Sequence, residues 1–78
     1  MSKHTLDVKG QLCPIPVIRT QNQVKKLAPG DILEVVCTDP GAMSDIPTWC
    51  RINGHSVIET ETNANNDIII TLEVGNQT

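Results

Sequence analysis

Glycine and proline stops cut this chain into short segments whose hydrophobic period switches between two and 3.6 residues. This order restricts the fold more than any other feature of the sequence. Period-two alternation of apolar and polar residues predicts strands, and helical spacing of apolar residues predicts helices. On this basis we expect strands over residues 4–8, 32–38, 55–62 and 67–74, and helices over 14–28 and 42–53.

The resulting β-α-β-α-β-β order predicts an α/β (α+β) two-layer sandwich, with two helices on one face of a mixed four-stranded sheet. Right-handed crossovers put both helices on the same side. Segment 32–38 is apolar on both faces, which is typical of a central strand. The length of 78 residues suits a single domain over 1–78, and with one Trp and no Phe or Tyr its core must be aliphatic.

The first helix has an unusual start, Cys13-Pro14-Ile15-Pro16. We expect Cys13 to be the N-cap, with Pro14 at the first helical position, where a missing N–H costs nothing. Pro16 then occupies the third position, and the N–H groups of Ile15 and Val17 remain to face the sulfur.

The second helix contains Pro47, which must lie in the first turn of a regular helix. The regular part is therefore expected to begin near Ser44 or Asp45, and either side chain can serve as the N-cap.

Cys13 is the candidate reactive group, because the positive pole at a helix N-terminus lowers a thiol pKa below its free value of about 8.5. Cys37 and Cys50 are expected in the core, too far along the chain to form a C-x-x-C pair. His4 and His55 are expected at strand ends on the surface, and neither is locally placed as a base. No zinc site and no cofactor-binding motif is predicted.

The charge pattern excludes some classes of partner. Net charge is −3, and no basic stripe with interleaved aromatics is present, so direct nucleic-acid binding is not expected. Arg19, Lys25 and Lys26 are interpreted as a solvated face, with steering of an acidic donor protein as the alternative. There is no apolar signal region or membrane-length run, so we expect a cytoplasmic monomer without a membrane partner.

The segment from Leu6 to Pro16, which contains the C-P-x-P motif, resembles the opening of the TusA/SirA family of sulfur-carrier proteins. Further matching stretches are Leu27-Ala28-Pro29-Gly30-Asp31, Thr38-Asp39-Pro40-Gly41-Ala42, Asp45-Ile46-Pro47, Cys50 and Gly54-His55. The resemblance covers nearly the whole chain. It implies a fold similar to the C-terminal domain of a translation initiation factor.

The resemblance also implies a role for Cys13, with Pro14 and Pro16 as its supporting motif. The cysteine would accept sulfane sulfur as a persulfide from a cysteine desulfurase or a rhodanese-like donor. It would pass that sulfur to a downstream acceptor protein complex, in tRNA thiolation, sulfur oxidation or molybdenum-cofactor sulfuration. The expected activity is that of a sulfurtransferase-type carrier rather than a stand-alone enzyme, and no cofactor is implied.

Two other functions compete with this interpretation. The same helix pole makes Cys13 oxidisable, which suits a redox-sensing regulatory or protein-interaction module. A stand-alone thiol transferase acting on a small molecule is the third possibility. The absence of a nearby base, a resolving thiol and a cofactor motif weighs against that enzyme.

Overall fold

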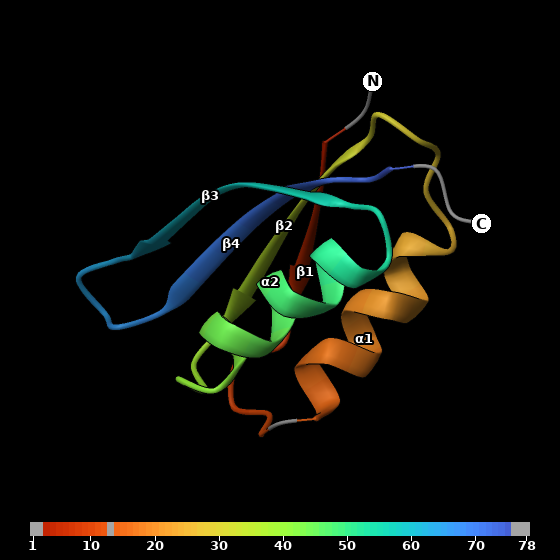
Figure 1. The fold of residues 1–78 in the computed structure, drawn as a ribbon. Coiled ribbons are helices and arrows are strands. Elements are labelled where there is room, and N and C mark those ends of the chain that lie inside the picture. The colour runs from red at the N-terminus through yellow and green to blue at the C-terminus, as the bar shows by residue number, and fades with distance from the viewer. Residues whose placement is uncertain (1–2, 13, 76–78) are drawn as a thin grey trace.

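The computed structural model describes residues 3–12 and 14–75 (Figure 1). The elements are β1 (Lys3–Asp7), α1 (Ile15–Val24), β2 (Ile32–Cys37), α2 (Ala42–Ile52), β3 (Ser56–Thr62) and β4 (Ile68–Glu73). Within these ranges, no helix is both long enough and apolar enough to cross a membrane.

The four strands form one mixed sheet in the order β1-β2-β4-β3. β1 and β2 are parallel, whereas β2 with β4 and β3 with β4 are antiparallel. The predicted element order, the mixed sheet and the central position of β2 are therefore confirmed. The two helices pack against each other on one face of the sheet, as Figure 1 shows.

The core lies between this face and the helices. Alternate residues of β2 and β4 point inward and are fully or almost fully buried, as the period-two pattern predicts. The core side chains from these strands are Leu33, Val35, Cys37, Ile68, Ile70 and Leu72, and those from the helices are Val24, Ala42, Ile46 and Cys50. Burial of Cys37 and Cys50 confirms their expected place in the core.

The first helix is shorter than predicted, because α1 ends at Val24 rather than near residue 28. Beyond it the chain tightens into turns, in which Lys26 N–H donates to Gln23 and Leu27 N–H donates to Val24. Pro29 disfavours helical geometry at the preceding residue, and the Asp31 carboxylate accepts the N–H of Ala28 at 3.0 Å. Local side-chain bonding thus replaces the last predicted helical turn.

The second helix begins at Ala42, as the predicted range 42–53 has it, but its regular part starts there too, with Gly41 as the N-cap, and not near Ser44 or Asp45. Neither Ser44 nor Asp45 caps it, and Pro47 lies well inside the helix instead of in its first turn. The start is displaced because the tight turn over 39–42 already closes backbone bonds, including Ala42 N–H to the Asp39 carbonyl at 3.0 Å. The helix tolerates Pro47 at the cost of the hydrogen bond that its missing N–H cannot make.

His55 is buried, so the expectation of a surface residue at a strand end was wrong. Its ring stacks on Trp49 with centroids 5.1 Å apart, and its Nδ1 accepts the backbone N–H of Gly75 at 2.9 Å. The closing C-terminal segment passes so near that a Cβ at Gly75 would lie 1.9 Å from the Gly54 carbonyl oxygen. His55 therefore joins the start of β3 to Gly75, which follows β4.

Candidate functional site

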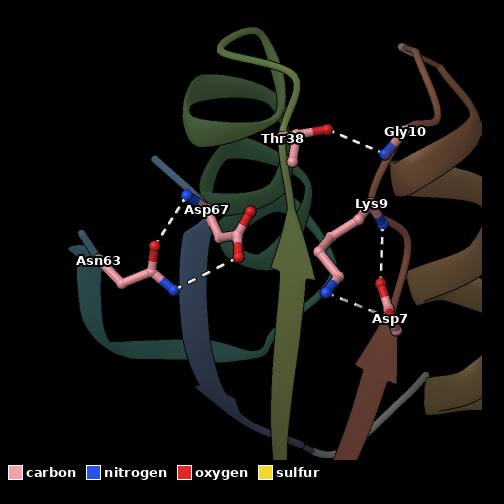
Figure 2. Close-up of polar contacts among 6 residues, drawn as sticks. All are labelled: Asp7, Lys9, Gly10, Thr38, Asn63 and Asp67. Carbon is pink, nitrogen blue, oxygen red and sulfur yellow. Dashed lines mark hydrogen bonds and ion pairs between the residues drawn. The ribbon is translucent and has the colours of Figure 1, made fainter. Parts of the chain in front are cut away.

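The loop between β1 and α1 is held against the end of β2 by backbone and side-chain bonds. Val8 N–H donates to the Val36 carbonyl at 2.8 Å, which extends the parallel pairing past β1. Gly10 N–H then donates to the Thr38 hydroxyl at 2.9 Å, a contact that Figure 2 shows beside the arrow of β2. Gly10 has a φ of 81°, a conformation that glycine adopts without a Cβ penalty. The bonds of Val8 and Gly10 thus hold the loop that leads to the C-P-x-P motif against the end of β2.

Cys13 itself lies outside the described residues. Its flanks are placed, and they change the predicted cap: Pro14 is the N-cap residue, Ile15 is the first helical residue and Pro16 is the second. The Ile15 N–H donates to the Leu12 carbonyl at 3.0 Å. It is therefore not free for the sulfur, and the predicted arrangement with Cys13 as N-cap is wrong by one residue.

Hydrogen bonds within α1 hold its first turn in place. Pro16 is buried, and its carbonyl oxygen accepts the hydroxyl of the fully buried Thr20 at 2.8 Å. The Pro14 carbonyl accepts the Ile18 N–H at 3.1 Å. Because proline holds φ near −65°, the two prolines stiffen this turn. Burial of Thr20 was not predicted, although its position follows Val17 by three and precedes Val24 by four, and the bond one turn back satisfies its hydroxyl.

The N-termini of α1 and α2 lie at the same edge of the sheet. β1 and β2 are parallel and each is followed by a helix, so both helices start outside the carboxyl ends of these strands, toward the bottom of Figure 1. In α/β sheets such an edge is the usual place for a functional site. The positive poles of both helices therefore lie at the edge of the sheet where the loop from β1 leads into the C-P-x-P motif.

The charged groups beside this loop are weakly paired. Asp7 accepts the backbone N–H of Lys9 at 2.9 Å, and its carboxylate lies 3.9 Å from the Lys9 ammonium (Figure 2). Both side chains are largely exposed, and ion pairs of this kind contribute little to stability. Figure 2 also shows the Asn63–Asp67 contact that closes the β3–β4 hairpin, away from the motif.

Gln11 has a buried side-chain oxygen, Oε1, which has no hydrogen-bond partner among residues 3–12 and 14–75. A buried acceptor of this kind costs about 1–3 kcal/mol. Its position two residues before the motif cysteine makes it a site residue that the sequence analysis missed. Nothing in the sequence signals this burial, since glutamine in a loop is ordinarily solvated.

The two cysteines that the structure describes are poor nucleophiles. Burial, with a smaller contribution from the charge of Asp39, raises the pKa of the Cys37 thiol, and burial raises the pKa of the Cys50 thiol to about 11. The Cys37 thiol also contacts the Ile68 carbonyl oxygen at 3.6 Å. Because the thiolate is the reactive form, both groups remain inert thiols near neutral pH.

Metal binding finds no support among the placed side chains. Over residues 3–12 and 14–75, no group of three or more His, Cys, Asp or Glu side chains is arranged to hold a metal ion.

Comparison with known proteins places this arrangement in a family. Residues 4–74 match the family model described as sulfurtransferase TusA. The putative sulfur carrier protein YrkI of Bacillus subtilis is 43% identical over 58 residues, which are 74% of this chain and 77% of that protein. The sulfur carrier protein TusA of Pseudomonas aeruginosa is 44% identical over 59 residues, which are 76% of this chain and 75% of that protein.

A solved structure agrees with the sequence matches. The crystal structure of a SirA-like protein from Desulfitobacterium hafniense superposes with a TM-score of 0.83 at 27% sequence identity, covering 94% of this chain and 99% of that one. The family resemblance read from the C-P-x-P motif and its companion segments is thereby confirmed. The chain belongs to the TusA family of sulfurtransferases.

Proposed function

We propose that this protein is a sulfur carrier and that Cys13 holds the travelling sulfur as a persulfide. The observation that carries the assignment to Cys13 is the burial of the other two thiols. Cys37 and Cys50 both have a raised pKa and point into the core. Cys13 is the remaining cysteine of the sequence, and it precedes the N-terminus of α1.

The transfer step balances without any outside oxidant or reductant. The Cys13 thiolate attacks the outer sulfur of a persulfide on the donor's cysteine. The donor's S–S bond breaks, its cysteine leaves as a thiolate, and a new S–S bond forms at Cys13. Delivery to the acceptor repeats the step in reverse, with the acceptor's nucleophile attacking the outer sulfur and Cys13 leaving as a thiolate.

The start of α1 suits both anions in this cycle. The helix pole stabilises negative charge near its N-terminus, whether the charge sits on the thiolate or on the outer sulfur of the persulfide. Pro14 and the buried Pro16 support the motif by restricting the first turn. Less motion in the free protein means less conformational entropy lost on reaching the transfer geometry.

The donor is a cysteine desulfurase or a rhodanese-like protein, and the acceptor belongs to a downstream pathway such as tRNA thiolation. These partners, the cytoplasmic location, the monomeric state and the single domain over 1–78 are parts of the proposal. The support for them is the family membership together with the placement of the motif at an edge of the sheet.

Mass spectrometry of the intact protein tests this function. After incubation with a cysteine desulfurase and L-cysteine, the wild-type protein should gain the mass of one sulfur atom, and reduction should remove it. Cys13→Ser should gain nothing, whereas Cys37→Ser and Cys50→Ser should load like wild type. Loading of Cys13→Ser, or no loading of wild type by any of several desulfurases and rhodaneses, would overturn the proposal.

A further inference from the structure

The outer face of α1 exposes large apolar side chains around the C-P-x-P motif. Leu12 is 74% exposed, Ile15 is 46% exposed and Ile18 is 49% exposed. Ile15 and Ile18 are three residues apart, so they lie on the same side of the helix, opposite the buried Pro16 and Thr20. Scattered exposed apolar residues are normal on a surface, but these three flank one short segment from both sides.

Basic residues lie next to the exposed Leu12, Ile15 and Ile18. Arg19 follows Ile15 by four positions and is exposed, and Lys25 and Lys26 are exposed in the turn after α1. No salt bridge to any of these three cations occurs over residues 3–12 and 14–75. Within α1 and α2 together, Asp45 is the sole acidic residue. The helix side of the molecule is therefore apolar near the motif and cationic beyond it.

The opposite face of the sheet carries the reverse charge. The strand register aligns exposed and half-buried residues across the face that no helix covers. The carboxylates on this face are Asp7, Glu34, Glu59, Glu61 and Glu73. The strand β1 also contributes a cation to it, Lys3. Lys3 is already paired with Glu34 at 3.6 Å. The two faces of this small protein thus differ in the sign of their charge.

We propose that Leu12, Ile15, Ile18 and Arg19 form a docking face for the sulfur-donor protein. Its partner surface is an apolar patch flanked by carboxylates around the donor's own cysteine. This inference rests on the proposed function, because it presumes that sulfur arrives from a protein.

The charge distribution selects this occupant and its orientation. Arg19 and the lysines beyond it attract the donor's carboxylates, while the acidic face of the sheet repels them, so the donor meets the motif first. The three apolar side chains lose their remaining water on contact and supply the desolvated centre of the interface. A second copy of this chain that met the first through the same face would be a poorer occupant, because Arg19 and the lysines of both copies would face each other.

Pairs of variants on the two faces test the docking face. Arg19→Glu and Lys3→Glu change the net charge equally, but on opposite sides of the protein. Ile18→Ser and Ile58→Ser each replace an exposed isoleucine, and Ile58, 57% exposed, lies on β3. The measurement is the second-order rate constant for loading Cys13 from a persulfidated cysteine desulfurase, at low and high salt.

Arg19→Glu and Ile18→Ser should each lower this rate constant by roughly five- to tenfold, while Lys3→Glu and Ile58→Ser stay within about twofold of wild type. The loss in Arg19→Glu should shrink at high salt, and the loss in Ile18→Ser should persist. Equal effects within either matched pair would overturn the docking face. A wild-type protein that sediments as a dimer through this face would also overturn it.

Glutathione persulfide separates this inference from the proposed function. This small donor needs no protein docking, so all four variants should load from it at the wild-type rate. Normal loading from glutathione persulfide, together with unchanged loading of Arg19→Glu and Ile18→Ser from the desulfurase, would refute the docking face alone. Failure of wild-type Cys13 to load from either donor would refute the proposed function.

Discussion

The two helices of this protein begin alike and differ in what neutralises their positive poles. Among the residues that the structure describes, no side chain caps the first N–H groups of α1 or α2. In α2, Asp45 places a carboxylate in the first turn, which compensates the pole from within the chain. In α1 the first turn has no acidic residue, and the motif cysteine precedes it. A helix pole without a built-in counter-charge is available to an anion that comes and goes.

The helices also differ in how they use their apolar residues. α2 turns Ala42, Ile46 and Cys50 fully into the core. α1 buries Pro16, Thr20 and Val24 but leaves Ile15 and Ile18 about half exposed. α2 exposes Ile52 only at its last residue, whereas α1 exposes Ile15 and Ile18 in its first turns, beside the motif.

The largest expected effect concerns the reactivity of the thiols. At pH 7 a buried thiol with the pKa of Cys50, about 11, is ionised to roughly one part in ten thousand. Alkylation of the folded protein with iodoacetamide should therefore modify Cys13 at least about a hundredfold faster than Cys50, and faster than the buried Cys37, whose pKa is also raised. Peptide mapping over time measures these rates. Comparable alkylation rates at Cys13 and Cys50 in the folded protein would contradict the distinction between a reactive thiol ahead of α1 and an inert thiol in α2.

The next effect is on stability, where the two helices should respond differently to the same truncation. Ile46→Ala removes a fully buried side chain of α2 and should lower the free energy of unfolding by about 2–5 kcal/mol. Ile18→Ala removes a half-exposed side chain of α1 and should change it by about 0.5 kcal/mol or less. Urea denaturation followed by circular dichroism measures both. A large loss in Ile18→Ala would mean that α1 packs its outer face within the domain.

A carboxylate placed at the start of α1 should remove the electrostatic difference between the helices. Ile15→Asp adds negative charge at the first helical position, so it should raise the pKa of the Cys13 thiol by about 0.2–0.7. Ile15→Asn is the uncharged control for the lost isoleucine and should leave this pKa nearer to that of wild type. The pH dependence of iodoacetamide alkylation measures the pKa. Identical profiles for the two variants would show that the pole of α1 does not act on the sulfur.

The smallest expected effect is a pH dependence that comes from the α2 side of the molecule. Burial lowers the pKa of His55 in the folded protein, and its Nδ1 accepts the Gly75 N–H, which requires the neutral imidazole. The unfolded chain binds a proton below about pH 6.5. The stabilising contribution is therefore fully present above that pH, and it declines as the pH falls toward the folded-state pKa.

Urea titrations between about pH 7.5 and 5, followed by Trp49 fluorescence, should show this decline in wild type. His55→Gln keeps a polar group that can accept a hydrogen bond but does not titrate. Its stability should depend less on pH over the same interval. An unaltered pH slope in His55→Gln would assign the decline to other groups.

Much of the fold could be predicted from local patterns. The order of helices and strands, the central β2 and the inward Cys37 all follow from hydrophobic periodicity, which is a property of neighbouring residues. The errors fall where a distant or competing partner decides the structure. His55 is buried because the distant Gly75 supplies an N–H and Trp49 supplies a ring, and neither contact is visible in a local pattern.

The candidate site was predicted in part. Pro14 and Pro16 do stand at the start of α1, but the helix begins one residue later than expected because the Ile15 N–H finds the Leu12 carbonyl. The buried Gln11 oxygen and the exposed Ile18 were not predicted. Helical spacing tells which residues share a side of a helix, whereas packing against the sheet decides which side is buried.

By itself, the sequence determined the element order, the aliphatic core and the C-P-x-P motif ahead of a helix, since each depends on residue types close together in the chain. Only the tertiary structure decided the strand order β1-β2-β4-β3, the meeting of two helix poles at one edge and the burial of His55. It also separated a cationic helix side from an acidic sheet face. These features depend on which distant segments pair and pack, and that pairing brings together charges and thiols that lie far apart in the sequence.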